Sequence, residues 1–170
     1  TKMKRVKLIN DPAELVALFR AIDSEERRNV MTTLSEGWTM ISGLVEKHGE
    51  GAHGAITYFE KFKLVESRWE VNNDTGRPEK SYRTFYNAFQ ISTSLTFDEA
   101  QELLTVVLMS EKEFDAFELK IVEMIGSDGT FANDISKELN ISSLTLKGLV
   151  RRSVKFDFKG HNIVPLKEEE

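Results

Sequence analysis

Residues 65–86 read VESRWEVNNDTGRPEKSYRTFY, and this stretch decides the fold that we expect for the chain. Its first seven residues alternate between charged side chains and apolar or small ones, which is the pattern of a half-buried strand. Residues 72–78 collect Asn, Asp, Gly and Pro, which favour a turn, and residues 80–86 form the returning strand. The stretch therefore predicts a β-hairpin, and we expect its aromatic residues Trp69, Tyr82 and Phe85 to pack in the hairpin core.

Four helices are predicted ahead of this hairpin. Residues 11–14 and 23–26 carry the acidic and Pro signals of helix starts, and apolar residues at helical spacing follow each of them. A third short helix follows a break at Gly37, and a fourth covers about residues 52–62. Four helices followed by a hairpin is the order of a winged helix-turn-helix domain, which we assign to residues 11–95.

Residues 96–126 form a helical stretch with a distinctive charge. They hold 8 acidic and 2 basic groups, so their net charge is −6. Their apolar residues form an arc that is wider than one core contact requires, and we expect burial both within the subunit and against a second one. The stretch is therefore predicted to be a helical linker that dimerises the protein through Leu103, Leu104, Val107 and Leu108.

Residues 127–167 repeat the first pattern on a smaller scale. A helix through Ile135, a tight turn at Asn140, a helix through Leu146 and a short hairpin around residues 159–162 follow one another. The fold class expected from the whole sequence is α+β, mainly α, with tandem winged helix-turn-helix domains joined by acidic dimerisation helices.

The composition excludes several classes of function. The 170 residues include 23 Lys and Arg, 28 Asp and Glu, three His and no Cys, and the net charge is −5. Without Cys the chain has no disulfide, thiolate nucleophile or sulfur-based zinc site, and His48 and His53 lack the further ligands that a metal needs. We therefore predict no catalytic residue, metal or cofactor. No apolar run is long enough to span a membrane and no signal-peptide pattern opens the chain, so we expect a cytoplasmic protein.

Four short stretches of the first domain carry a family resemblance. They are LFRAI at residues 18–22, ERRNV at 26–30, EKFKLV at 60–65 and GRPEKSY at 76–82. By their order and spacing, residues 18–85 resemble the ArsR-type winged-helix repressors, especially their archaeal branch. The resemblance implies a transcription regulator that acts as a homodimer on double-stranded DNA. One helix of each subunit would enter the major groove, and the hairpin, or wing, would contact adjacent phosphates.

The resemblance also assigns candidate DNA-binding residues. The first recognition helix corresponds to residues 52–62, and Gly54 and Ala55 stand in it where the family places polar or basic residues. Because small side chains make no bidentate contacts to bases, phosphate contacts are expected to outweigh base contacts. Residues 134–142 resemble a generic helix-turn-helix, which makes the helix after them a second candidate. The candidates are His53, Thr57 and Tyr58 on the first helix, Arg77, Lys80 and Arg83 on the wing, and Lys147, Arg151 and Arg152 on the second helix.

Alternative functions stay open at this point. Residues 49–54, GEGAHG, match the dinucleotide-binding fingerprint, but the strand that this fingerprint requires does not precede them. The negative net charge and the Gly54–Ala55 pair favour a winged-helix module that binds proteins rather than DNA. A third hypothesis is a ligand-gated regulator with an effector pocket between its domains, lined by Trp38 or Trp69. The sequence specifies neither an effector, an operator nor the direction of regulation.

Overall fold

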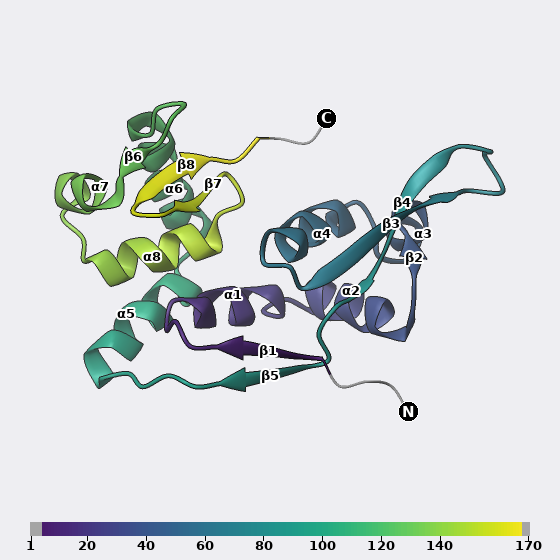
Figure 1. Cartoon of the computed structure of the whole chain (residues 1–170), viewed down its shortest axis with the longest axis horizontal. Coiled ribbons are helices and arrows are strands. Elements are labelled where there is room, and N and C mark those ends of the chain that lie inside the picture. The colour runs from purple at the N-terminus through teal and green to yellow at the C-terminus, as the bar shows by residue number, and fades with distance from the viewer. Residues whose placement is uncertain (1–4, 168–170) are drawn as a thin grey trace. The chain divides into compact units, whose positions relative to one another are not determined.

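The computed structural model describes residues 5–167, and its contacts divide the chain into two compact units (Figure 1). The first unit comprises the segment up to Ile9 and residues 19–92, and the second comprises residues 10–18 and the chain from Thr93 onwards. Both units combine helices with small sheets. The prediction of an α+β protein that is mainly α is confirmed, and we describe each unit by itself.

The first unit contains a helical cluster and two small sheets. Its elements are β1 (Val6–Ile9), α1 (Glu14–Ala21, whose first residues belong to the second unit), α2 (Glu25–Glu36), β2 (Thr39–Met40), α3 (Ile41–His48), α4 (Gly51–Lys61), β3 (Val65–Val71), β4 (Pro78–Thr84) and β5 (Ala88–Ile91). Leu34, Leu44, Ile56 and Phe59 are fully buried and come from α2, α3 and α4, so these three helices form one core.

The hairpin predicted from residues 65–86 is confirmed. Strands β3 and β4 pair antiparallel from Val65 opposite Thr84 to Val71 opposite Pro78, and β2 adds a third strand beside β4. We call the β3–β4 hairpin the wing. Tyr82 is buried in it, but Trp69 is 68 % exposed and Phe85 is 37 % exposed, contrary to expectation. Trp69 lies opposite Lys80, two residues before the end of β3 that leads into the turn, and the β3–β4 hairpin extends away from the helices in Figure 1.

Two local details differ from the expected pattern. Helix α2 is capped by Ser24, whose hydroxyl accepts a hydrogen bond from the backbone N–H of Arg27, whereas Asp23 forms an ion pair with Arg20. Strands β1 and β5 form a parallel pair, with Val6 opposite Ala88 and Ile9 opposite Ile91. No pattern in the sequence predicted this pair.

The second unit repeats the order of elements seen in the first. It contains α5 (Phe97–Leu108), α6 (Glu111–Met124), β6 (Thr130–Phe131), α7 (Ala132–Leu139), α8 (Ser143–Arg152), β7 (Phe156–Lys159) and β8 (Asn162–Pro165). From α6 to β8 the order is helix, strand, two helices and a hairpin, as it is from α2 to β4. In both units the second strand of the hairpin lies at the centre of a three-stranded sheet, in the orders β2-β4-β3 and β6-β8-β7.

The turn between α7 and α8 follows from local sequence. Asn140 adopts a left-handed conformation with φ of 52° and ends α7, as expected for a residue type that tolerates this region. Ser142 then caps α8 by accepting a hydrogen bond from the backbone N–H of Thr145 at 3.0 Å. These two residues set the direction of α8, whose charged side chains were predicted to bind DNA.

The core of the second unit draws on distant parts of the chain. Ala13 and Val16 come from the N-terminal segment, and they pack with Val106 of α5, Ile121 of α6 and other buried residues. Helices α5 and α8 approach closely, because a Cβ at Gly148 would lie 3.2 Å from a methyl carbon of Val106. Both α5 and α6 are therefore part of this core.

Candidate functional site

Helix α4 presents a narrow exposed face. His53, Gly54 and Thr57 are exposed on it, and the Thr57 hydroxyl donates a hydrogen bond to the backbone carbonyl of His53 at 3.0 Å. Tyr58, a predicted groove-facing residue, is only 1 % exposed. Its ring packs against Arg27, whose guanidinium carbon lies 4.4 Å from the ring centroid. The exposed face of α4 thus holds two of its three candidates.

The wing carries its three candidate cations in different environments. Arg77 is exposed beside the turn. Lys80 is half-buried, with its ammonium nitrogen 5.8 Å from the ring centroid of Trp69 on the same face. Arg83 forms an ion pair with Glu66, and its guanidinium carbon lies 4.6 Å from the ring centroid of Trp38. The charge of Arg83 is therefore partly neutralised within the unit, whereas Arg77 points its charge to solvent.

A carboxylate holds the wing at the start of helix α3. Oε1 of Glu79 accepts hydrogen bonds from the backbone N–H of Ser42 at 3.0 Å and from its hydroxyl at 2.6 Å. Oε2 accepts a third from the side-chain amide of Asn72 at 3.0 Å. The Ser42 hydroxyl, followed by the Asn72 amide and the Ser42 backbone N–H, lowers the pKa of Glu79 below its ordinary value. This negative charge lies at a helix N-terminus, where the helix dipole favours it.

The three candidate cations of helix α8 differ in exposure more than those of the wing do. Lys147 is exposed, and Arg151 is half-buried, with its guanidinium 3.7 Å from Asp11 and 4.0 Å from Asp157. Arg152 points the other way, and only 1 % of its side chain is exposed.

The guanidinium of Arg152 is used inside the second unit. Its Nη1 donates to the backbone carbonyls of Val106 at 2.9 Å and Met109 at 2.7 Å, and its Nη2 donates to Glu111 at 3.0 Å. Helix α5 ends at Leu108, so Val106 lies in its last turn and Met109 is its C-cap residue, and the carbonyls there have no intrahelical donors to satisfy them. Arg152 therefore caps the end of α5 and is not on a surface that DNA could reach.

Helix α5 divides the predicted dimer residues between two faces. Leu103 is buried in the core of the second unit, and Val107 packs against the same core. Leu104 and Leu108 are 54 % and 72 % exposed, and Phe97, which the sequence analysis did not select, is 90 % exposed. With Gln101, these three residues follow one another at spacings of four, three and four along one helix face. This heptad-like spacing is the signal that could have identified Phe97.

We searched the described residues for metal-ligand clusters and for membrane-spanning helices. Within residues 5–167, no group of three or more His, Cys, Asp or Glu side chains could hold a metal ion. His48 instead lies 2.7 Å from the hydroxyl of Thr33, and His53 lies 3.6 Å from Glu50. No helix in the same range is both long enough and apolar enough to cross a bilayer.

Comparison with known proteins decides the family. The model of the family described as ArsR transcriptional regulator matches residues 9–167. The chain belongs to the ArsR family. The match covers both units of this ArsR-family protein and confirms the resemblance that the residues between 18 and 85 carry. A search of curated proteins found no significant match. As a member of the ArsR family, the protein falls in a class of transcription regulators, and helix α4 and the wing are the elements that the family resemblance assigns to DNA.

Proposed function

We propose that this protein is a sequence-specific DNA-binding transcription regulator that acts as a homodimer. The observation that carries the proposal is the family match over residues 9–167. The arrangement of the first unit supports it, because α3 and α4 are followed by a wing with exposed Arg77 and half-buried Lys80. These cations can contact phosphates, while His53 and Thr57 on α4 face the major groove.

We further propose that the second unit is a second winged helix-turn-helix domain. Its order of elements from α6 to β8 and its sheet order match those of the first unit. We take α6 as its first helix, since α6 shares a core with α7 and α8. Lys147 and Arg151 are its candidate phosphate contacts, whereas the burial of Arg152 and of Tyr58 leaves both outside the proposed interface.

A salt-dependent binding experiment tests the DNA proposal. Fluorescence anisotropy would follow the binding of random and genomic duplexes between about 50 and 300 mM salt, where counterion release makes phosphate binding steeply salt-dependent. In the double variant Arg77→Ala with Lys80→Ala, we expect the slope of log affinity against log salt to fall by up to about 3.6, because each of the two subunits loses two contacts and each contact contributes about 0.9. The matched control is Lys112→Ala with Lys120→Ala, which removes two exposed cations from α6.

Each other outcome has a definite meaning. A reduced slope only in Lys147→Ala with Arg151→Ala would assign the DNA contact to the second unit. An equal reduction in the control pair would show that net charge alone governs binding, and it would contradict the proposed interface. The absence of binding at the lowest salt concentration would reject DNA binding altogether.

We propose the exposed face of α5 as the dimer contact. Phe97, Gln101, Leu104 and Leu108 line this face, and a second copy of α5 would bury all four by the packing of heptad-spaced side chains. In Leu104→Glu with Leu108→Glu, two charges would enter that contact, and analytical ultracentrifugation should find a monomer. Leu119→Glu is the matched control, because Leu119 is equally exposed but lies on α6. A dimer that survives the double substitution would contradict this choice of surface.

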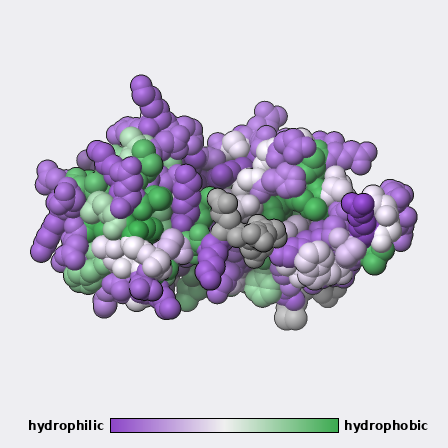
Figure 2. Space-filling view, turned by 90° about the horizontal axis from the view of Figure 1, so that it is seen from above, coloured by the Kyte–Doolittle hydropathy of each residue, from purple (hydrophilic) through white to green (hydrophobic). Residues whose placement is uncertain are grey.

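One observation favours a second candidate function, a protein-interaction module. Trp69 and Val71 are exposed two residues apart on strand β3, so they share one face of the wing, and contiguous exposed apolar surface marks interaction sites. The face drawn in Figure 2 is mainly hydrophilic, with apolar side chains gathered in patches between the polar ones. A module that binds only proteins would not bind the duplexes even at the lowest salt concentration, so the anisotropy experiment separates the two functions.

A further inference from the structure

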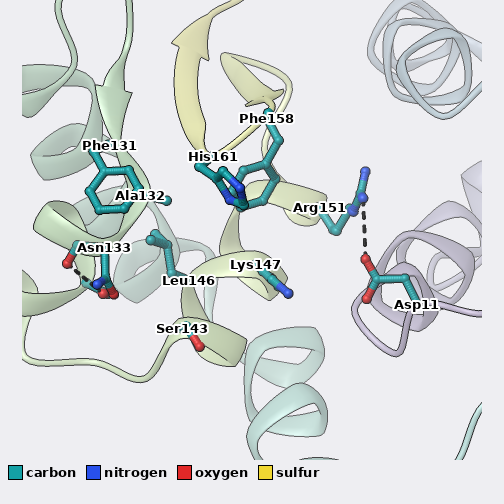
Figure 3. A pocket seen from close by; sticks show the side chains of 12 residues that line it. Asp11, Phe131, Ala132, Asn133, Ser143, Leu146, Lys147, Arg151, Phe158 and His161 are labelled. Atoms are coloured by element: carbon teal, nitrogen blue, oxygen red, sulfur yellow. Dashed lines mark hydrogen bonds and ion pairs between the residues drawn. The ribbon is translucent and has the colours of Figure 1, made fainter.

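The second unit contains an open pocket that the proposed function does not use. It has a volume of about 460 Å³ and lies among α7, α8 and the β7–β8 hairpin, with Asp11 at one side (Figure 3). This volume lies within the range of about 300–1,000 Å³ that is typical of small-molecule sites. All its lining residues belong to the second unit. Neither tryptophan of the chain is among them, so it differs from the effector pocket that the sequence suggested.

The walls of the pocket differ in chemistry. Phe131, Leu146 and Phe158 supply apolar surface, and His161 also lines the pocket (Figure 3). Lys147 and the ion pair between Arg151 and Asp11 supply the charged wall on the right of the same view. A ligand with an apolar body and one polar end would match both walls.

The charges of the pocket favour a single negative charge on the ligand. Asp11 and Asp157 lie at 3.7 and 4.0 Å from the Arg151 guanidinium and offset its charge. Lys147 is exposed one turn before Arg151 on α8. Its ammonium group is the cation of the pocket that can pair with a bound anion. The N-terminus of α7 also borders the pocket, and its N-cap residue Phe131 makes no side-chain capping bond. Its dipole adds to the attraction that Lys147 provides.

We propose that this pocket binds a small aromatic monoanion of the aryl carboxylate class. The carboxylate pairs with Lys147, and the ring lies against Phe131 and Phe158. A phosphate of the DNA backbone satisfies the cation equally well but leaves the apolar wall uncovered, so the lining favours the small aromatic anion. Lys147 and Arg151 are also the proposed phosphate contacts of the second unit, and a bound ligand would therefore compete with DNA for this face.

Ligand-observed fluorine NMR tests the proposal without any DNA, so its outcome does not depend on the proposed function. The probes are para-fluorobenzoate and its neutral counterpart para-fluorobenzamide, titrated to about 10 mM at constant ionic strength, a range that detects millimolar affinity. We expect the benzoate to bind about tenfold more tightly than the benzamide, because its carboxylate forms a charge-assisted hydrogen bond with Lys147 that the neutral amide cannot form. In Lys147→Ala this preference should disappear, while the amide spectrum of the protein stays dispersed.

The control is Lys159→Ala, which removes an exposed lysine of the same hairpin that does not line the pocket. It should keep the full preference for the benzoate. Equal affinity for both probes, the same loss in both variants, or no binding at the highest concentration would overturn the proposal. Complete displacement of the benzoate by an equal concentration of inorganic phosphate would also overturn it, because the site would then recognise the anion without the ring.

Discussion

Replacing Arg152 with Met tests whether this residue is a structural cap or a DNA contact. The substitution keeps an apolar chain over the ring of Phe114, where the guanidinium carbon now lies 4.4 Å from the ring centroid. It removes the donors that reach the carbonyls of Val106 and Met109. Both carbonyls at the end of helix α5 would then lose the hydrogen-bond donor that Arg152 provides.

The size of the effect follows from these contacts. Hydrogen bonds from a charged donor contribute about 1.5–3 kcal/mol each, and Arg152 donates two such bonds to buried backbone carbonyls. We therefore expect Arg152→Met to lower the free energy of unfolding of the second unit by about 3–5 kcal/mol. The neighbouring Arg151 is half-buried and its ion pairs are long, so Arg151→Ala should cost about 0–1 kcal/mol.

Amide hydrogen exchange measures this difference locally. The tryptophans at 38 and 69 both lie in the first unit, so their fluorescence does not report on the second. The amides of Leu149 and Val150 in α8 do, and a loss of 3–5 kcal/mol corresponds to exchange that is about 10²- to 10⁴-fold faster. Arg151→Ala should leave exchange within about tenfold of the unchanged protein.

One result would refute the reasoning. If Arg152→Met exchanges at the rate of the unchanged protein and loses DNA affinity as Lys147→Ala does, then Arg152 is not a cap. Its guanidinium would have to reach the surface in solution, and the assignment of the α5 carbonyls to it would be wrong.

Three further predictions concern smaller features. Hydrogen bonds lower the pKa of Glu79 in the folded chain, so the carboxylate stabilises the fold fully above the unfolded pKa near 4.5. This stabilisation is lost as the pH falls through the lower pKa of the folded chain. Glu79→Gln should therefore cost about 1 kcal/mol at neutral pH and nothing in strong acid, as denaturant unfolding at several pH values would show. At Gly129 φ is 93° and a Cβ would lie 2.7 Å from a methyl carbon of Val164, so Gly129→Ala should lower the melting temperature; Gly126→Ala, in open space, should not. Asn140→Ala should cost about 1 kcal/mol and Asn140→Gly almost nothing in denaturant titrations, because only the left-handed conformation distinguishes them.

The sequence was sufficient for the wing and for the turn before α8, which depend on neighbours along the chain. Alternation from Val65 to Val71 and the turn after it predicted the wing, and Asn140 predicted the turn before α8. Capping is equally local, but Asp23 and Ser24 are both good caps and only the ion pair of Asp23 with Arg20 decides between them. Periodicity alone does not contain that information.

The candidate site was harder to predict because side-chain direction depends on distant packing. Arg151 and Arg152 are adjacent and chemically identical, yet only Arg152 faces the end of α5. Tyr58 follows Thr57 on a helix predicted to face DNA, but one residue turns a helix by about 100°, enough to move a side chain from surface to core. The parallel pair of β1 and β5 joins segments about 80 residues apart, and no turn signal marks such a pairing.

The two units of this chain are interleaved in sequence, and this affects how the protein can be made and divided. Ala13 and Val16 belong to the core of the second unit, although the first unit occupies residues 19–92. During synthesis the N-terminal segment must wait for residues beyond 103 to leave the ribosome before its apolar side chains are covered. Cleavage between Ser92 and Thr93 would not release two intact domains, because the C-terminal fragment would lack part of its own core.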